Sequence, residues 1–427
     1  MDNLVKIVDL LDFDEFVKVT TGIVSGAAEE DAHFVVISAD FSNFKDINKT
    51  YGVEAGDKLI ARLADAFIGS EDCVVACHSY SDHIVGLFQY ASFDKWDEKR
   101  KELTQFQIDF CAKNRSEFPK TAIHLNTGVY IINDNSEQIT SCVDKANIAR
   151  RSIKGVYTVP YGIYTEAMQK QKETESKIIP LFEKALEEEA ILVYLQPKMS
   201  VKNKGIKGAE ALTRLLDEDG KVVSPDVFIP ILEDSGKIIE LDHYVMRYVF
   251  KMIRSWLDQG KKVVPVSINL SKIHFYYDTL VENIISEFDQ YGISPEYVEF
   301  EVTESVFFEE TSFLINKIEE LRAHGFKVSV DDFGSGYSSL NMIGILPVDI
   351  IKLDKGFIKN SLNNAKGKNI IKGLIKILNE IEMDIVCEGI ENSDEEKTVY
   401  EFGCDTMQGF LYDRPIPVVD FETKYIM

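Results

Sequence analysis

The chain has 427 residues, which suits two domains better than one, and its 45% of hydrophobic residues suffice for ordinary cores. Its 47 lysines and arginines stand against 71 aspartates and glutamates, which gives a formal net charge of −24. This charge argues against a DNA-binding groove or a basic membrane surface, and it means that local cations such as bound metals must attract an anionic substrate.

The first 168 residues predict an α+β domain. Residues 56–69 carry Leu59, Leu63 and Phe67 at helical spacing. The predicted strands cover residues 33–41, residues 73–90 as a pair around the turn-prone SYSD, and residues 122–132.

Part of this domain resembles a known family. The segment ADFSNFKDINKTYGVEAGD is similar to the metal- and guanine-binding stretch of GGDEF domains, which have the nucleotide-cyclase-like fold of diguanylate cyclases. The positions kept are Asp40, Phe44, Lys45, Asn48 and Asp57.

The GGDEF signature itself is altered, because this chain has Tyr80-Ser81-Asp82-His83-Ile84 in its place. The two family glycines let the backbone approach a triphosphate, and an imidazole is a poor substitute for a hard carboxylate. The resemblance therefore implies a degenerate GGDEF-like domain without cyclase activity. Asp40, Asn48 and Asp57 leave open a regulatory nucleotide site, for instance for GTP, and the alternative is a scaffold or dimerisation domain.

Residues 165–177 are polar, lack glycine and proline, and run into the amphipathic segment IIPLFEKALEEEA. We predict domains at residues 1–168 and 169–427, with a helical linker near residues 165–188. Such a connector either transmits a signal or acts as a spacer.

Eight strand-like runs, most of them separated by helix-like segments, make up the second half. The runs are ILVYLQP, IKGAEAL, VVPVSINLS, YVEFEVTE, FKVSVDDFG, VDIIKLD, MDIVCEGIE and CDTMQGF. Strands separated by helices imply a parallel sheet, and eight of them imply closure into an α/β, TIM-like (β/α)8 barrel with its chemistry at the carboxyl rim. Two predicted amphipathic helices carry apolar stripes at Ile238, Leu241, Val245, Val249, Ile253 and Trp256, and at Ile370, Leu374, Ile377 and Ile381.

Polar side chains end nearly all of these runs. Adjacent strand side chains point to opposite faces, so Asp331 and Asp332 can serve one site only if the strand has ended, and Gly334 and Gly336 provide that exit. Lys352 has apolar flanks, and a lysine pointing into a ring of carboxylates is costly unless it is paired. Carboxylates with one amide and one lysine predict a hard-cation site aimed at a phosphate.

Residues 177–427 resemble an EAL-domain cyclic di-GMP phosphodiesterase. The motifs that carry the resemblance are YLQP, Glu210-Ala211-Leu212 followed by Thr213-Arg214, SINLS, EVTES, DDFGSGYSSL, IKLDKGFI, EGIE and QGF. The family chemistry implies two divalent cations, Mg²⁺ or Mn²⁺, and hydrolysis of cyclic di-GMP to linear pGpG.

The resemblance also implies roles for single residues. The metal ligands are Glu210, Asn269, Glu301, Asp331 and Asp332. The catalytic group is Lys352 and Glu388, together with Glu304 as an anchor for the loop after Asp332. The substrate contacts are Gln196, Leu212, Arg214, Glu391 and Gln408.

Family members commonly form a homodimer through the barrel, coupled to the site by the DDFGSG loop. Two alternatives differ in class from the phosphodiesterase. A non-catalytic cyclic di-GMP receptor would be expected to have lost metal ligands, and a bifunctional cyclase and phosphodiesterase is disfavoured by Tyr80, Ser81 and His83.

The six cysteines are scattered and form no CxxC pair, and the apolar surroundings of Cys73 and Cys77 favour core packing over metal binding. The acidic, amphipathic N-terminal segment is unlike a signal peptide, and no apolar run approaches the roughly 18 residues of a membrane span. We therefore expect a reduced, cytoplasmic protein.

Overall fold

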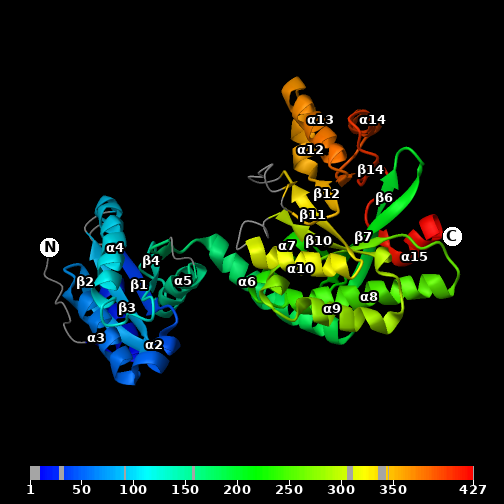
Figure 1. The fold of residues 1–427 in the computed structure, drawn as a ribbon. Coiled ribbons are helices and arrows are strands. Elements are labelled where there is room, and N and C mark those ends of the chain that lie inside the picture. The colour runs from blue at the N-terminus through cyan, green and yellow to red at the C-terminus, as the bar shows by residue number, and fades with distance from the viewer. Residues whose placement is uncertain are drawn as a thin grey trace. The chain divides into compact units, whose positions relative to one another are not determined.

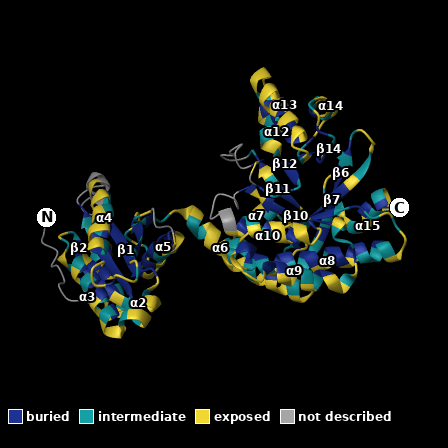
Figure 2. Ribbon diagram, viewed as in Figure 1, coloured by how far each residue is buried: buried dark blue, intermediate teal, exposed yellow. Residues whose placement is uncertain are grey.

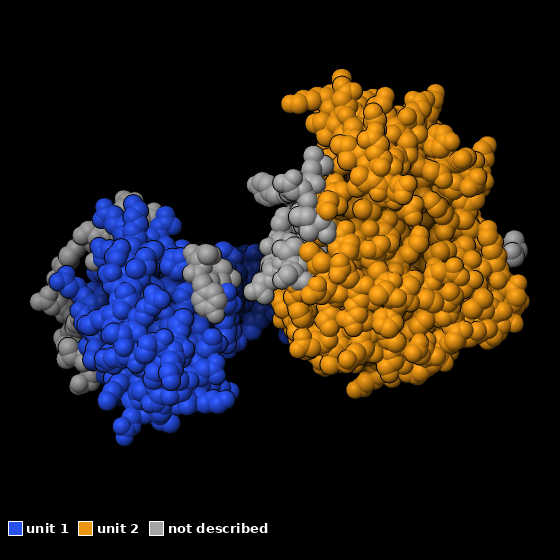
Figure 3. All heavy atoms as spheres, in the orientation of Figure 1, with its two compact units in different colours: residues 1–176 blue, residues 177–427 orange. Residues whose placement is uncertain are grey.

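The computed structural model describes residues 10–27, 33–90, 93–155, 159–304, 311–334, 343–344 and 346–426. The chain divides into two compact units, residues 1–176 (unit 1) and residues 177–427 (unit 2), which Figure 3 shows in different colours. The division falls within helix α6, which spans Glu166–Glu187.

Unit 1 contains a five-stranded sheet in the order β2-β3-β1-β4-β5, in which only β4 and β5 pair in parallel (Figure 1). Its strands are β1 His33–Phe41, β2 Cys73–Tyr80, β3 His83–Tyr90, β4 Leu125–Ile131 and β5 Gly162–Ile163. Its helices are α1 Phe13–Gly26, α2 Phe44–Tyr51, α3 Val53–Gly69, α4 Phe93–Asn114 and α5 Ile139–Ser152.

Local sequence patterns account for much of unit 1. The predicted helix face of Leu59, Leu63 and Phe67 is buried against the sheet, and Cys73 and Cys77 are buried free thiols. The strand pair predicted within residues 73–90 forms β2 and β3, which are joined by a tight turn at residues 81–82. The α+β prediction for the first half is confirmed.

Unit 2 is a closed barrel of eight strands with helices around it (Figure 1). The ring runs β6-β14-β13-β12-β11-β10-β9-β7 and closes through the pairing of β6 with β7. Its strands are β6 Leu192–Ser200, β7 Gly205–Leu216, β9 Val266–Asn269, β10 Val298–Thr303, β11 Lys327–Phe333, β12 Ile350–Leu353, β13 Asp384–Cys387 and β14 Thr406–Met407. Two short strands, β8 Val222–Val223 and β15 Ile416–Pro417, add to β7 and β6. The TIM-like prediction is therefore confirmed, with one exception.

The exception is strand β6, which is antiparallel to both of its neighbours in the ring. Only residues 201–204 join β6 to β7, and so short a connection can link antiparallel strands but cannot cross over to a parallel one. The prediction of a wholly parallel sheet was wrong at this strand. Gln196 consequently lies within β6, opposite Glu210, and not at a carboxyl end on the rim.

Helices cover the outside of the barrel, and Figure 2 shows the buried strands they enclose. They are α7 Pro225–Asp234, α8 Ile238–Asp258, α9 Leu280–Phe288, α10 Thr311–Ala323, α12 Lys355–Leu362, α13 Ala365–Glu380, α14 Ser393–Glu401 and α15 Val418–Phe421. Short 3-10 helices span Lys272–Tyr276, Asp289–Tyr291 and Pro295–Tyr297, and a π-helix spans Glu422–Ile426. The stripe predicted on α8 is fully buried, from Ile238 to Trp256.

Of the stripe predicted on α13, Leu374 is buried as expected, and the other three residues are not. The buried residues are Ile371, Leu374, Ile375 and Leu378, whereas Ile370, Ile377 and Ile381 are 53%, 44% and 49% exposed. The segment is apolar on two faces, so helical periodicity alone could not decide which face meets the barrel.

Within the described residues, no helix is both long enough and apolar enough to cross a bilayer.

Candidate active site

The side chain of Lys352 lies at the centre of a ring of carboxylates. It comes from β12 and is fully buried. Its Nζ is 2.7 Å from Glu301 Oε2, 2.8 Å from Glu388 Oε1, 3.0 Å from Asp331 Oδ1 and 3.5 Å from Glu210 Oε2. Four acids, each from a different strand or strand end, therefore pair with Lys352, as a buried lysine requires.

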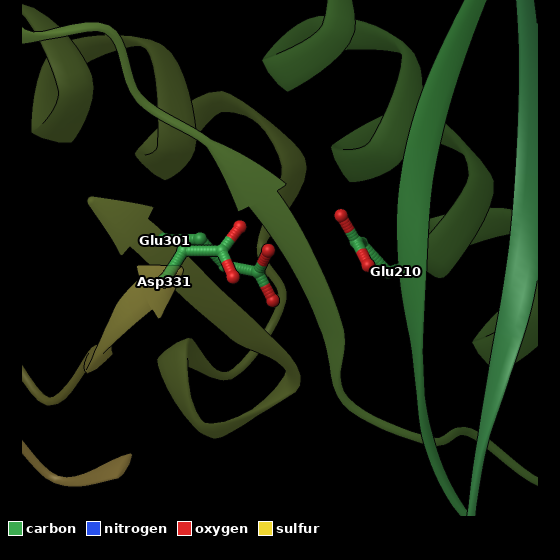
Figure 4. A group of neighbouring side chains, drawn as sticks. All are labelled: Glu210, Glu301 and Asp331. Atoms are coloured by element: carbon green, nitrogen blue, oxygen red, sulfur yellow. The ribbon is translucent and has the colours of Figure 1, made fainter. Parts of the chain in front are cut away.

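Parallel strand register brings these acids together. On β10 and β11, Glu301 pairs with Ser329 and Thr303 with Asp331, so the two acids extend from adjacent strands. Figure 4 shows Glu301 and Asp331 converging, with Glu210 facing them from β7. One carboxylate oxygen from each of these three residues lies within 4.8 Å of the others, as do oxygens of Asp331, Asp332 and Glu388.

A bulge in β11 allows the side chains of both Asp331 and Asp332 to reach the carboxylate ring. The strand continues to Phe333, with a register shift against β12 between Val330 and Phe333, and Asp332 has a φ of 56°. The prediction that the strand ends at Asp331 was wrong, because a left-handed residue in a bulge breaks the side-chain alternation without ending the strand. Gly336, the second glycine of the predicted exit, lies outside the described residues.

Two amides bind Glu210, and a third contacts one of these two. Asn269 Nδ2 donates to its Oε1 at 3.2 Å, and Gln408 Nε2 donates to its Oε2 at 2.6 Å. Gln408 Nε2 is also 3.0 Å from Gln196 Oε1, and Gln196 Nε2 donates to the Asp413 carbonyl at 3.1 Å. Gln196 and Gln408 are both buried, so in this structure Gln408 orients Glu210 and Gln196 holds Gln408.

Burial and crowding change the acidity of the ring. Burial and the neighbouring Glu301 raise the pKa of Glu210 to about 7. Burial raises the pKa of Glu388 to about 8, although Lys352 opposes the shift. Burial also raises the pKa of Asp331 and of Asp332. Glu210 and Glu388 therefore hold protons near neutral pH more readily than ordinary carboxylates, and a bound cation would displace those protons.

Glu301 behaves differently because it lies between two lysines. Burial alone would raise its pKa, but Lys198 and Lys352 outweigh burial and lower the pKa to about 2. Lys198 Nζ is 2.8 Å from Glu301 Oε1 and 3.0 Å from Glu299 Oε1, and all three side chains are buried. Lys198 was missed from the sequence, although it stands two residues after Gln196 on β6 and therefore shares its face.

The composition of the ring fits divalent cations. Six carboxylates, those of Glu210, Glu299, Glu301, Asp331, Asp332 and Glu388, surround the two ammonium groups of Lys198 and Lys352. With all of them ionised, the surplus is four negative charges, which two divalent cations would balance. Together with the Asn269 amide, the donors are all oxygen atoms, as hard cations such as Mg²⁺ or Mn²⁺ prefer.

A groove of about 250 Å³ lies beside the carboxylates, and Leu212, Arg214, Asn269 and Glu301 are among the residues that line it. Arg214 Nη1 donates to the Thr213 carbonyl at 2.7 Å, and its guanidinium carbon lies 5.4 Å from the ring centroid of Tyr194. The predicted substrate contacts Leu212 and Arg214 thus border the same space as two of the predicted metal ligands, Asn269 and Glu301.

Glu391 lies near the exit of β13 and binds two lysines of α12. Lys355 Nζ and Lys359 Nζ are each 2.8 Å from its carboxylate oxygens, and these hydrogen bonds lower the pKa of Glu391 to about 2. Asp354 accepts a hydrogen bond from Phe357 N and so begins α12 directly after β12. The two lysines were not singled out from the sequence.

Glu304 follows β10 and accepts a 3.3 Å hydrogen bond from Gly334 N through its Oε2. This contact holds the first residue after β11. The loop that Glu304 is predicted to anchor continues through residues 335–342, which lie outside the described residues.

The three residues predicted for a nucleotide in unit 1 occupy different surroundings. Asp40 is buried on β1, Asn48 lies on α2 with its Oδ1 buried near Gly56, and Asp57 is exposed on α3. Burial would raise the pKa of Asp40, but a hydrogen bond from His83 and the charge of Arg150 outweigh it and lower that pKa. Arg150 was also missed from the sequence.

Comparisons with known proteins agree with this architecture. Residues 182–415 match the family model "EAL domain", and residues 14–155 match "Diguanylate cyclase, GGDEF domain". Signaling protein YkoW of Bacillus subtilis is 27% identical over 92% of this chain and 49% of its own length. The bifunctional diguanylate cyclase/cyclic di-GMP phosphodiesterase MucR of Pseudomonas aeruginosa is 26% identical over 97% of this chain and 60% of its own. The chain thus spans about half the length of these curated relatives, or slightly more.

A solved structure of the MucR phosphodiesterase in complex with c-di-GMP is 30% identical to this chain, with a TM-score of 0.54. The match covers 57% of this chain and 99% of that one. The closed barrel, its carboxylate ring and these matches together show that the chain belongs to the EAL domain family, with a GGDEF domain ahead of its EAL domain.

Proposed function

We propose that unit 2 is a metal-dependent phosphodiesterase that hydrolyses cyclic di-GMP to linear pGpG. The observation that carries the proposal is the convergence of Glu210, Glu301, Asp331 and Glu388 on Lys352, beside a groove lined by Arg214. A receptor that only binds the dinucleotide would not need so many buried acids, whose mutual repulsion is costly without cations.

The acids divide into two sets of ligands. Glu210, Asn269, Glu301 and Asp331 would hold one cation, and Asp331 with Asp332 would hold a second. When bound, the cations stabilise the charge on the phosphate and lower the pKa of a water molecule. The choice between Mg²⁺ and Mn²⁺ does not change this assignment, because both prefer oxygen ligands.

The remaining residues bind, orient and move protons. Lys352 keeps a fixed positive charge beside the reacting phosphate, because Glu301, Asp331 and Glu388 hold its ammonium in place. Glu388 lies 2.8 Å from Lys352 Nζ, and bound cations would favour its ionised form, which can accept a proton from the attacking water. The water oxygen then bonds to phosphorus, one P–O3′ bond breaks, and the departing 3′ oxygen takes up a proton from solvent.

A product assay tests this function. The full chain is incubated with cyclic di-GMP and Mg²⁺ or Mn²⁺, and Glu210→Ala serves as the matched control. We expect pGpG from the native chain alone, because Glu210 belongs to the first ligand set. Binding of cyclic di-GMP without product under either metal would support the receptor and contradict the enzyme.

We also propose that unit 1 makes no cyclic dinucleotide and acts as a regulator or scaffold. Tyr80 and Ser81 carry side chains at the altered signature, and the His83 ring packs against Tyr80 with centroids 4.1 Å apart. If GTP regulates unit 2 through Asn48 and Asp57, then Asp57→Ala should abolish any effect of GTP on pGpG formation. An unchanged effect would place the nucleotide elsewhere.

A homodimer through α13 is the third part of this proposal. Ile370 and Ile377 are exposed along one face of this helix, and so is Ile381 directly after its end. A Cβ added at Gly373, three residues after Ile370, would meet no atom within 4 Å. An apolar stripe with a small residue suits close helix pairing between two copies of the chain. We expect Ile377→Glu to shift the mass measured by light scattering from dimer to monomer, whereas Lys376→Glu, at an exposed neighbouring position, should not.

The setting proposed for the protein is the reducing cytoplasm. All six cysteines are free thiols, and five of them are buried.

A further inference from the structure

Asp40 in unit 1 is surrounded by donors from its own chain. Its Oδ1 accepts a 2.8 Å hydrogen bond from Asn126 Nδ2, and its Oδ2 accepts one from Arg150 Nη1. His83 Nε2 lies 3.2 Å from the same Oδ2. Both carboxylate oxygens are therefore already engaged, in a place where a divalent cation would need at least one of them.

The partner charge is as deeply buried as the acid. Arg150 is 2% exposed and Asp40 is 7% exposed, so neither side chain can turn to solvent without local opening. A buried guanidinium and a buried carboxylate each carry a large desolvation cost, which only their mutual pairing offsets. Exchange of Arg150 for a hydrated cation would leave the guanidinium buried and unpaired.

The backbone is arranged so that Arg150 can reach this position. A Cβ at Gly128 of β4 would lie 2.0 Å from the Ala146 carbonyl oxygen and 2.3 Å from Arg150 N, so a glycine is what allows α5 to lie directly on the sheet. Arg150 Nε is 3.4 Å from Asn147 Oδ1, which also accepts a hydrogen bond from Ser38. The guanidinium is thus held on both sides.

The neighbouring acid, Asp82, also accepts hydrogen bonds from its own chain. Asp82 Oδ2 accepts a 2.8 Å hydrogen bond from the backbone N–H of Phe41, and its Oδ1 accepts one of 3.2 Å from Ser81 Oγ. Asp82 follows Ser81, whose φ of 52° sets the tight turn between β2 and β3. These residues do not fit a divalent cation, because Asp40 pairs with Arg150 and Asp82 accepts a hydrogen bond from the backbone.

We propose that Arg150 is an internal counter-ion that takes the place of a divalent cation at Asp40, so that unit 1 cannot bind a metal–nucleotide complex through this carboxylate. Any influence of unit 1 on unit 2 then follows a route that needs no metal at Asp40. Removal of the guanidinium should create a cation site that the native chain lacks. This inference does not depend on the reaction proposed for unit 2.

The test counts Mn²⁺ ions bound to the full chain by electron paramagnetic resonance. All variants carry Glu210→Gln, Asp331→Asn and Asp332→Asn, which should remove Mn²⁺ binding by the carboxylates of unit 2. In this background, we expect the chain with Arg150 to bind no Mn²⁺ that depends on Asp40. The Arg150→Met chain should bind one Mn²⁺ more per chain. The gain should disappear when Asp40→Asn is added, and Arg150→Lys, which keeps the positive charge, should show no gain.

Two results would overturn the proposal. One is Mn²⁺ bound by the chain with Arg150 intact and lost on Asp40→Asn. The other is a folded Arg150→Met chain that gains no Mn²⁺.

A second measurement does not require that the Arg150 variant folds. The chain has two tryptophans, so Trp256→Phe leaves Trp96, buried in unit 1, as the fluorescent reporter of that unit. With Arg150 present, Mn²⁺ and GTP together should cause no Asp40-dependent shift in the unfolding midpoint that Trp96 reports. A shift that Asp40→Asn abolishes would show that a metal does bind there.

Discussion

Lys198 offers the sharpest test of the charge balance in the barrel. Its ammonium is buried between Glu299 and Glu301, with contacts of 3.0 and 2.8 Å. Lys198→Met keeps most of the side-chain volume and removes the charge. Breaking a buried pair by removing one partner costs about 3–5 kcal/mol, because the remaining charge is left uncompensated.

This cost translates into a measurable shift. For a domain of this size, 1 kcal/mol corresponds to about 2–4 °C in Tm, so we expect the midpoint of unit 2 to fall by about 6–20 °C in EDTA at pH 8. The deficit in midpoint should shrink as the pH falls, because Lys198 helps to hold the pKa of Glu301 low and Glu301 takes up a proton more readily without it. It should also shrink with Mn²⁺, since cations bound to Glu301 restore positive charge.

Two matched variants control this experiment. Lys198→Met with Glu299→Gln removes one charge of each sign and should recover most of the lost stability. Lys221→Met removes an exposed lysine and should change the midpoint little. A Lys198→Met midpoint within about 2 °C of the native value, or a double variant no better than the single one, would refute the reasoning.

Three further predictions concern the ring itself. Gln408→Leu should weaken Mn²⁺ binding about 10–100-fold by freeing Glu210, measured as the metal concentration for half-maximal activity, while saturating metal should restore much of the rate. Asp332→Asn should lower turnover more than cyclic di-GMP binding, and equal losses would mean that it positions the ligand instead. Mn²⁺ affinity should rise with pH through about 7 to 8 and then level off, because the raised pKa values of Glu210 and Glu388 make protons compete with the metal. Calorimetry in buffers of different ionisation enthalpy should detect the released protons, and an affinity independent of pH would contradict the assignment.

The same pKa shifts set the sign of the stability change in the metal-free protein. An acid whose pKa is higher in the folded state binds its proton more tightly there, so folding is favoured below that pKa. The midpoint of unit 2 in EDTA should therefore fall as the pH rises from about 5 to 8, and added Mn²⁺ should reverse the fall.

Several parts of the site could be read from the sequence because they depend on local periodicity. Glu301 and Lys352 each occur in a short strand with apolar neighbours, and strand alternation is enough to place both side chains in the barrel. The need to pair Lys352 followed from the cost of burying a charge. Glu210 and Asn269 could be grouped with them because parallel strands end at a common rim.

Other features required the tertiary structure. The bulge at Asp332 depends on a left-handed backbone conformation that its residue type does not demand. The buried face of α13 was ambiguous because two apolar stripes share one helix. The contacts of Lys198 with Glu301 and of Arg150 with Asp40 join residues 103 and 110 positions apart.

Spacing and residue chemistry are enough to predict the alternation of strands and helices, the two-part organisation and the oxygen-rich character of the ring. The reversed direction of β6 within the ring and the internal pairing of Asp40 emerge in the folded chain, because both depend on contacts between segments that lie far apart in the sequence. A charge that is buried on folding needs an opposite charge beside it, and neither composition nor periodicity predicts which residue supplies that charge.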